Sequence, residues 1–316
     1  MNVTLPRAEL IGLDWGTSSL RAYLLDDGRH VLEARVRHSG TCQLPAGGFD
    51  AALDEVLDGW PACPVLAAGM VGSRDGWREV PYVDLPASLA AVAGALSFVD
   101  SGSGRRVHLV PGLRNTTAAD VMRGAETRIF GALALQPVLA AGSSLLLPGR
   151  HGTWARVRDG RVVDFATMMT GELYAAVRHH TTLATGLPEQ DPPSDQEAFV
   201  RGVQAARDSG PAGALSRLFS ARALVLAGKL DARAVPDYVS GLLIGEELRS
   251  ALAAGRINHS TPLQLIANSA LCDRYAAAAT CFDVGIAVPP PAAAALGLWQ
   301  IARRAGLTSL SLHSAA

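Results

Sequence analysis

The chain has 316 residues, of which 49% are hydrophobic and 18% are charged, and its formal net charge is −1. A chain of this length can bury one large core or two ordinary ones, and two domains are expected. Because 28 Lys and Arg residues balance 29 Asp and Glu residues, the charge gives no reason to expect binding to nucleic acid or to an anionic membrane. A small molecule is therefore the expected partner.

The cysteines and the first residues indicate a reduced, cytoplasmic protein. The cysteines show no CxxC pair and no histidine at ligand spacing, so neither zinc nor a disulfide framework is predicted; they are Cys42, Cys63, Cys272 and Cys281. The first ten residues contain Pro6, Arg7 and Glu9 without an apolar core. Apolar runs elsewhere fall short of the roughly 20 residues that a membrane span needs. Neither export nor a membrane anchor is expected.

The first predicted element is an apolar strand at residues 9–13 that leads into Asp14. The small-residue turn Gly16-Thr17-Ser18 and a second apolar run at residues 20–25 follow, which predicts a β-hairpin. Backbone N–H groups converge in such a turn and can hold an anion, while the hydroxyls add donors. Asp14 would then lie beside phosphates, where a carboxylate binds Mg²⁺ directly or through water. The plainer alternative is a hairpin in which Asp14 only satisfies turn N–H groups.

A repeat extends this hairpin into two three-stranded meanders. The first continues through the turn Asp26-Asp27-Gly28 to a strand at residues 30–36, and the second has strands at 144–147, 153–158 and 161–165 with turns at 148–152 and Asp159-Gly160. Both Asp-Gly turns suit tight hairpins, because glycine accepts positive φ. Helix-like stretches at 49–60 and 172–180 follow the two meanders. Strands and helices then alternate, which predicts added parallel strands with crossover helices.

The motifs resemble, in order and content, the 2-dehydro-3-deoxygalactonokinase family of the sugar-kinase, actin and heat-shock-protein superfamily. The matching pieces are residues 14–22, 68–73, 76–77, 81–82, 110–113, 121–124, 169–173 and 240–245. The resemblance implies an α/β fold with two ribonuclease-H-like domains, each a meander plus βα units, that face one another across a cleft. We place the N-terminal domain at residues 1–115 and the C-terminal, nucleotide-side domain at 116–291, and helix 292–308 is expected to pack back on the first.

The resemblance also implies chemistry: ATP and Mg²⁺ as cofactors, and transfer of a phosphoryl group to the 6-hydroxyl of 2-dehydro-3-deoxy-D-galactonate. Asp14 would position the metal, and the phosphate or nucleotide contacts would be Gly16, Thr17, Ser18, Gly149, Arg150, His151, Asn268 and Ser269. The residues assigned to the sugar acid are Gly69, Met70, Val71, Gly72, Arg74, Trp77 and Tyr82. Gly69 and Gly72 would let the backbone approach a substrate. Trp77 and Tyr82 either form an apolar wall of the site or are core aromatics. Arg74 suits a carboxylate, although a solvated surface arginine is the alternative.

A first departure from the family pattern concerns the general base. Residues 123–127 open a predicted helix, and the family carries two consecutive acids where this chain has Ala125 and Glu126. Alanine cannot accept the proton of a hydroxyl. Glu126 or Asp120 is the expected replacement, and Arg123 completes this catalytic group. Glu126 could equally be a first-turn acid that the helix dipole favours.

Two further departures lie in the nucleotide motifs. Thr153 occupies the position of a family lysine, and Arg150 in the same turn either restores a positive charge at the phosphates or is an exposed turn residue. His151 either binds phosphate or braces the turn. Asn268-Ser269 replaces an adenosine-contacting Gly-Thr turn, and asparagine tolerates left-handed backbone better than other residues with a side chain.

Three hypotheses follow. The leading one is an ATP- and Mg²⁺-dependent sugar-acid kinase. The second is a degenerate relative that binds sugar acid or nucleotide without efficient phosphoryl transfer, and the third is a structural or partner-binding protein. The sequence leaves open whether the substrate derives from galactonate or gluconate, and it leaves open the oligomeric state, a homodimer among the options.

Overall fold

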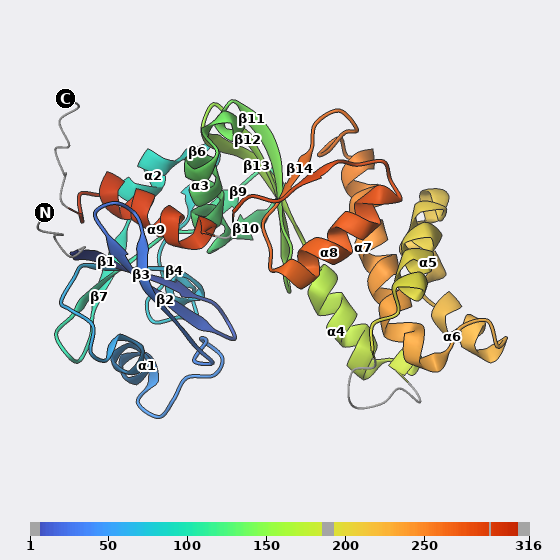
Figure 1. The fold of residues 1–316 in the computed structure, drawn as a ribbon, viewed down its shortest axis with the longest axis horizontal. Coiled ribbons are helices and arrows are strands. Elements are labelled where there is room, and N and C mark those ends of the chain that lie inside the picture. Colours follow the sequence, from blue (N-terminus) through green and yellow to red (C-terminus); the bar gives the residue numbers. More distant parts are fainter. Residues whose placement is uncertain (1–6, 185–192, 291, 309–316) are drawn as a thin grey trace, which may run out of the picture. The chain divides into compact units, whose positions relative to one another are not determined.

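A computed structural model describes residues 7–184, 193–290 and 292–308 of the chain (Figure 1). It forms two compact units. Unit 1 comprises the described parts of Met1–Gly142, Val157–Phe165 and Pro289–Ala316, and unit 2 comprises those of Ser143–Arg156 and Ala166–Val288. These borders differ from the domain boundary expected at residue 115, because the helix α3 (Ala125–Leu135) belongs to unit 1 and packs there against α9 (Ala293–Arg304).

Unit 1 is built on a six-stranded sheet in the order β3-β2-β1-β4-β8-β7. Its strands are β1 (Ala8–Trp15), β2 (Leu20–Asp26), β3 (Val31–Arg37), β4 (Val65–Gly69), β7 (Ser97–Asp100) and β8 (Arg106–Leu109). The first three strands form the antiparallel meander that the sequence predicts, and β4 and β8 continue the sheet in parallel with β1. This is the expected ribonuclease-H-like arrangement.

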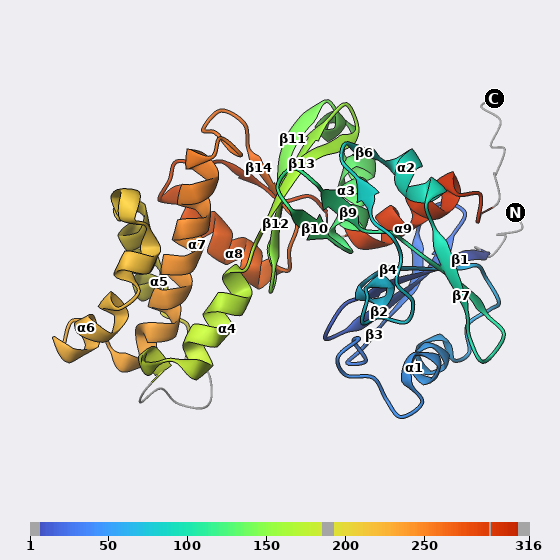
Figure 2. The same ribbon diagram turned by 180° about the vertical axis from the view of Figure 1, so that it is seen from behind.

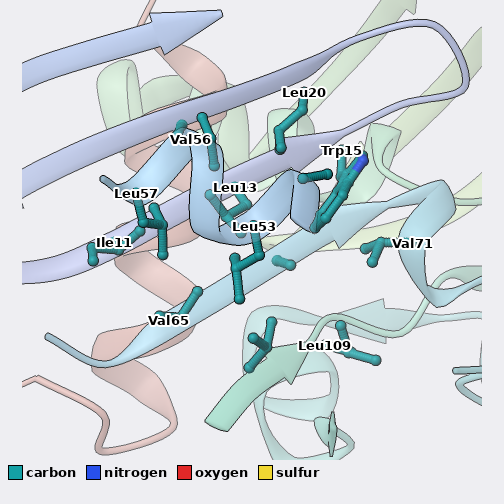
Figure 3. Close-up of a cluster of buried hydrophobic side chains, with 14 of the residues drawn as sticks. Ile11, Leu13, Trp15, Leu20, Leu53, Val56, Leu57, Val65, Val71 and Leu109 are labelled. Atoms are coloured by element: carbon teal, nitrogen blue, oxygen red, sulfur yellow. The ribbon is translucent and has the colours of Figure 1, made fainter. Parts of the chain in front are cut away.

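Successive residues of β1 point to opposite faces of this sheet, and a different helix covers each face. Ile11, Leu13 and Trp15 point to the face covered by α1 (Gly48–Leu57), where they form a fully buried core with the helix (Figure 3). Gly12 and Asp14 point to the opposite face. A Cβ atom on Gly12 would lie 3.0 Å from Leu298 of α9, so this helix packs directly on the strand. The even-numbered positions therefore place Asp14 on the side of α9.

The two Asp-Gly turns differ. At Asp159-Gly160 both residues have positive φ (51° and 68°), as the sequence predicts for a tight hairpin. In the first meander the expectation for Gly28 is wrong, because Arg29 takes the positive φ of 70° instead. There the Asp26 carboxylate accepts the N–H of His30 (2.7 Å), so an aspartate side chain closes the turn.

Several short elements complete unit 1. They are β5 (Val83–Asp84), β6 (Ala87–Ser88), β9 (Leu113–Asn115), β10 (Asp120–Met122), α2 (Leu89–Gly94), and the 3₁₀ turns η1 (Met70–Gly72) and η2 (Pro137–Ala140). Strands β10, β9 and β5 form a small sheet of their own. It places Asp120 opposite Asn115, and Met122 opposite Leu113.

The second meander lies in a six-stranded sheet in the order β15-β14-β11-β12-β13-β6. Its strands are β11 (Gly142–Leu147), β12 (Gly152–Arg158), β13 (Arg161–Met168), β14 (Leu263–Leu265) and β15 (Ile286–Ala287). β14 runs parallel to β11, and β15 runs parallel to β14. The predicted repeat of a meander extended by parallel strands is confirmed. Its three meander strands contribute residues to both units.

Helices make up most of unit 2. They are α4 (Thr170–His180), α5 (Gln196–Arg207), α6 (Ser220–Leu226), α7 (Val235–Ala253) and α8 (Ser269–Thr280), with the 3₁₀ turns η3 (Thr182–Ala184), η4 (Gly210–Ala212), η5 (Ala214–Arg217) and η6 (Ala232–Ala234). Helices α5 and α7 lie side by side in both views (Figures 1 and 2). Glycines permit this approach, because Cβ atoms on Gly202 and Gly241 would each lie 2.0 Å from a carbonyl of the other helix. Among the described residues, no helix has the length and apolar character needed to span a membrane.

Candidate active site

Asp14 is the next-to-last residue of β1, next to the predicted phosphate turn, and is paired with arginine. The residue is only 7% exposed, and its Oδ2 atom accepts a hydrogen bond from Nη2 of Arg128 at 2.8 Å. Arg21, the cross-strand neighbour of Asp14, places Nη1 3.9 Å from the same oxygen. The backbone itself closes the turn, since the N–H of Gly16 donates to the carbonyl of Ser19 (2.9 Å). The carboxylate is thus held by two guanidinium groups.

A loop that the sequence analysis did not single out braces this turn. The N–H groups of Thr41 and Cys42 donate to the carbonyls of Gly16 and Thr17, each at 3.0 Å. Gly40 is required for the contact, because a Cβ atom there would lie 2.3 Å from the Thr17 carbonyl oxygen. These two hydrogen bonds engage carbonyl oxygens of the turn, and Ser18 stays exposed. The glycine was the only sequence signal for this loop.

The segment assigned to the sugar acid packs largely against the protein itself. Gly69 has φ of 101°, and a Cβ atom there would lie 2.6 Å from the Trp15 carbonyl oxygen. A Cβ atom on Gly72 would lie 3.2 Å from Nη1 of Arg123. Val71 is fully buried in the core, whereas Met70 is partly exposed. The structure therefore shows a packing reason for both glycines, and their contact with a substrate stays a prediction.

The two aromatic residues assigned to the sugar acid also pack against the protein itself. Trp77 stacks on Phe49 with ring centroids 5.5 Å apart and meets Trp15 edge-on at 6.0 Å, so it is a core aromatic. Tyr82 is half-buried beneath the guanidinium of Arg123, which lies 4.3 Å from its ring centroid. Arg74 is exposed just after η1. Of these residues, Arg74 is the one that the fold leaves accessible to a carboxylate.

Arg123 combines one firm contact with two unpaired donors. Its Nη2 atom donates to the carbonyl of Val80 at 2.7 Å. Its Nε and Nη1 atoms are buried and have no hydrogen-bond partner in the part of the chain that the structure describes. Buried donors are rarely left unpaired in proteins, which makes this guanidinium a candidate for an acceptor from a ligand.

Glu126 lies at the start of α3 and is completely buried. Its carboxylate accepts hydrogen bonds from the N–H of Gly124 (2.7 Å) and from the hydroxyl of Thr127 (3.0 Å). Burial raises the pKa of this carboxyl to about 7, although these hydrogen bonds and Arg123 oppose the shift. A carboxylate without exposed surface is poorly placed to take a proton from a substrate hydroxyl. We interpret Glu126 as the residue that holds the first turn of α3.

The other acid considered as the base is more accessible. Asp120 begins β10 and is partly exposed, and its Oδ1 atom accepts the N–H of Val121 at 2.7 Å. Ala125, which replaces a family acid, is the first residue of α3 and is partly exposed as well. An acid at that position would thus have been accessible where Glu126 is not.

In unit 2, the turn at residues 148–152 is tied to α4 through one carboxylate. Glu172 accepts a hydrogen bond from Nη2 of Arg150 at 3.2 Å and makes a short contact with Nε2 of His151. These hydrogen bonds, that of His151 first, lower the pKa of the Glu172 carboxyl. A Cβ atom on Gly171 would lie 2.4 Å from the Gly149 carbonyl oxygen, so helix and turn are in direct contact. This geometry supports the bracing role of His151, and it leaves Arg150 67% exposed.

A buried acid that no sequence pattern indicated lies next to this turn. Glu247 of α7 is 3% exposed and accepts hydrogen bonds from three side chains: Trp154 Nε1 (2.7 Å), Thr170 Oγ1 (2.6 Å) and Tyr275 OH (2.6 Å). Burial raises the pKa of its carboxyl. A Cβ atom on Gly152 would lie 3.1 Å from Glu247 Oε1. Glu247 thus joins β12, α4 and α8.

The remaining two departures from the family pattern lie in different environments. Thr153, at the lysine position, is buried on β12. Asn268 caps α8, with its side chain accepting the N–H of Leu271 at 3.0 Å. Its backbone is extended, with φ of −71° and ψ of 164°, so the tolerance of asparagine for left-handed backbone is not used here. Asn268 and Ser269 are both exposed at the start of this helix.

Comparisons with known proteins agree with these motifs. A model of the family described as 2-keto-3-deoxy-galactonokinase matches residues 14–301. The 2-dehydro-3-deoxygalactonokinase of Escherichia coli (strain K12) is 36% identical over 272 residues, which cover 85% of this chain and 88% of that protein.

Solved structures extend the comparison to the fold. A Sinorhizobium meliloti protein assigned as a 2-dehydro-3-deoxygalactonokinase is 34% identical with a TM-score of 0.83, over 93% of this chain and 98% of that one. The activator of 2-hydroxyisocaproyl-CoA dehydratase from Clostridium difficile shares the fold alone, with a TM-score of 0.51 and 13% identity over 94% of this chain and 96% of that one. This chain belongs to the 2-keto-3-deoxy-galactonokinase family, and it is a phosphotransferase that acts on an alcohol group.

Proposed function

We propose that this protein is an ATP-dependent kinase that phosphorylates the 6-hydroxyl of 2-dehydro-3-deoxy-D-galactonate. The observation that carries the proposal is the family match over residues 14–301, with 36% identity to a relative of that name. The braced turn after Asp14 supports it, because a rigid turn of small residues is a suitable cradle for phosphate oxygens. Phosphoryl transfer needs mainly positioning and charge stabilisation from the protein.

The residues at this turn fit a magnesium ion brought in by a nucleotide. Among the described residues, no three His, Cys, Asp or Glu side chains gather as a metal site. Mg²⁺ does not need such a cluster, because it takes one or two carboxylates and completes its shell with phosphate oxygens and water. Asp14 would be the carboxylate, and the ion would neutralise charge on the phosphates. The turn at residues 16–18 would supply protein contacts to phosphate, and the turn at residues 149–151 of unit 2 is a separate candidate for such contacts.

For the proton of the hydroxyl, we propose Asp120 in place of Glu126. Asp120 is partly exposed whereas Glu126 has no exposed surface. A general base contributes about 10² to 10⁴ in rate, so a poorly placed base slows transfer without abolishing it. For the carboxylate of the sugar acid, Arg74 is the exposed candidate.

A second candidate function is a family member that binds its ligands and transfers phosphate inefficiently. Two observations favour it. Ala125 stands where the family carries an acid, and the neighbouring Glu126 is enclosed in its own hydrogen bonds. The two functions predict the same ligands and differ in the rate of turnover.

The test is release of ADP from Mg-ATP in the presence of 2-dehydro-3-deoxygalactonate, with 2-dehydro-3-deoxygluconate assayed in parallel. The expected result is stoichiometric ADP and a 6-phosphate, with the galactonate-derived acid preferred. Calorimetric binding of ATP and sugar acid without detectable ADP at high enzyme concentration would establish the second function. No binding of either ligand would contradict both.

A further inference from the structure

Near the end of β1, Asp14, Arg21 and Arg128 form a cluster with more positive than negative charge. Asp14 contributes one negative charge, and Arg21 and Arg128 contribute two positive ones. Both contacts go to the Oδ2 atom of Asp14, at 3.9 and 2.8 Å. Within these contacts two guanidinium charges face one carboxylate charge, and an anionic ligand would balance the excess.

Arg128 has binding capacity left over after its bond to Asp14. A guanidinium carries five N–H donors, and here only Nη2 has a hydrogen-bond partner among the described residues. Its Nε atom is buried without one. An arginine fork can hold two oxygens of one anion side by side, so the unused donors match a phosphoryl group.

Both arginines remain accessible to a ligand. The Arg128 side chain is 34% exposed and the Arg21 side chain is 46% exposed, whereas the Asp14 side chain between them is only 9% exposed. The adjacent tyrosine, Tyr23, keeps its proton, since burial and Asp14 raise the pKa of its hydroxyl, and it therefore adds no negative charge.

The local topology also brings the pair to the phosphate turn. Asp14 and Arg21 are directly opposite each other in the β1–β2 ladder, one register position behind the turn at residues 16–19. Arg128 lies one helical turn after Gly124, at the end of α3 that approaches Gly69. Two strands and one helix of unit 1 therefore converge on this point.

We propose that Arg128, with Arg21 beside it, binds an oxygen of the terminal phosphoryl group of the nucleotide next to Asp14. The inference rests on the proposed kinase function and adds a phosphate-binding residue to it. Arg128 has two tasks in this arrangement: it holds Asp14 in position through Nη2, and it presents its unused donors to the phosphate. Asp14 keeps its Oδ1 atom outside these contacts and thus available to a metal ion.

The test compares nucleotides that differ by one phosphate. The Kd of Mg-ADP and of the non-hydrolysable Mg-adenylyl-imidodiphosphate is measured by calorimetry for the wild type, Arg128→Gln and Arg128→Lys. Glutamine keeps a donor toward Asp14 and removes the charge, so folding is preserved better than with alanine. We expect Arg128→Gln to weaken the analogue about tenfold and ADP less than about threefold, as for loss of one charge-assisted hydrogen bond. Arg128→Lys keeps the charge but lacks the fork, so it should bind the analogue more tightly than Arg128→Gln and less tightly than the wild type.

The matched control is Arg106→Gln, which removes another arginine of unit 1 that pairs with an aspartate (Asp100, 2.8 Å) on the surface. It should change neither Kd. An equal loss for ADP and the analogue in Arg128→Gln, or no loss, would overturn the inference. If the wild type bound no nucleotide, the kinase proposal would fail. The role of Arg128 in binding phosphate would then be tested by measuring the binding of pyrophosphate. Weaker pyrophosphate binding in Arg128→Gln than in the wild type would then support it, and equal binding would refute it.

Discussion

The two small-residue turns of this protein come from the same meander motif but are held in different ways. In unit 1 the turn after Asp14 is braced through its own carbonyls, and the carboxylate beside it is buried between arginines. In unit 2 the turn at residues 148–152 is tied down by an accessible carboxylate, Glu172, while the buried acid, Glu247, lies behind it. Charge interactions weaken with exposure to water. The carboxylate beside the first turn therefore depends on electrostatics, whereas the second turn depends mainly on packing and hydrogen bonds.

The largest expected effect comes from Asp14→Asn. The substitution removes the charge that would bind the metal and leaves the two arginines without their counter-ion. We expect kcat/KM for ADP release to fall by about 10² to 10³, the range for loss of a preorganised electrostatic group. Circular dichroism should show an unchanged fold. Activity equal to that of the wild type would remove Asp14 from the mechanism.

The next effect concerns stability, and it tests the second turn. Glu247→Ala leaves Trp154, Thr170 and Tyr275 without their common acceptor. We expect a loss of about 3–5 kcal/mol in the free energy of unfolding, as for a broken buried polar network. Urea denaturation measures it. Arg150→Ala in the same turn is the comparison, and a similar loss in both variants would contradict the distinction drawn between buried and exposed contacts.

The buried acid of unit 1 predicts a pH effect. The pKa of Glu126 is raised to about 7, so between its unfolded value and about 7 the native state binds more protons than the unfolded state. Stability from this group is therefore full at low pH and is lost as the pH rises toward 7, by up to roughly 1.4 kcal/mol per pH unit. The side chain introduced by Glu126→Gln does not titrate, so this variant lacks the pH effect of Glu126.

Urea denaturation at pH 5, 6, 7 and 8 checks this difference. The wild type should lose stability relative to Glu126→Gln across this range. Parallel curves for the two proteins would show that Glu126 is ionised in the folded state at pH 5, and the interpretation of a raised pKa would be wrong.

The smallest effect is expected from Arg150→Ala. Because this side chain is 67% exposed, its ion pair with Glu172 should contribute no more than about 1 kcal/mol to stability. If Arg150 replaces the missing lysine at the phosphates, the Kd of ATP should rise several-fold. A Kd equal to that of the wild type would assign Arg150 to the surface and would leave phosphate binding to the first turn.

Local patterns allowed most of the strands to be predicted. Alternating side chains and turn residues lie within a few positions of one another, so both meanders, α1 and the start of α3 were visible in the sequence. Helix α7 was not, although its Ser240–Gly245 segment matched the family. The helix is buried along most of its surface, including Val239, Leu242 and Leu248, so it lacks the polar stripe that reveals a helix.

Only part of the candidate site could be predicted from the sequence, because its other residues come from distant parts of the chain. Asp14 and its turn are contiguous, and their chemistry could be inferred directly. Arg128 is 114 positions away from Asp14, and Glu247 is 93 positions away from Trp154, so no spacing rule joins them. Whether a carboxylate is exposed also depends on distant packing. The sequence therefore leaves open whether Glu126 is a base or a first-turn acid of the helix, and only the structure shows that it is enclosed.

The sequence by itself determined the repeated meanders, the family and the acid at the end of β1, because these depend on local periodicity and on contiguous motifs. Only the tertiary structure decided which charged groups meet. It placed Arg128 on Asp14, enclosed Glu126 beneath Gly124 and gathered three donors around Glu247. The physical reason is that burial and pairing of charges are set by elements far apart in the chain, whereas turns and strands are set by neighbours.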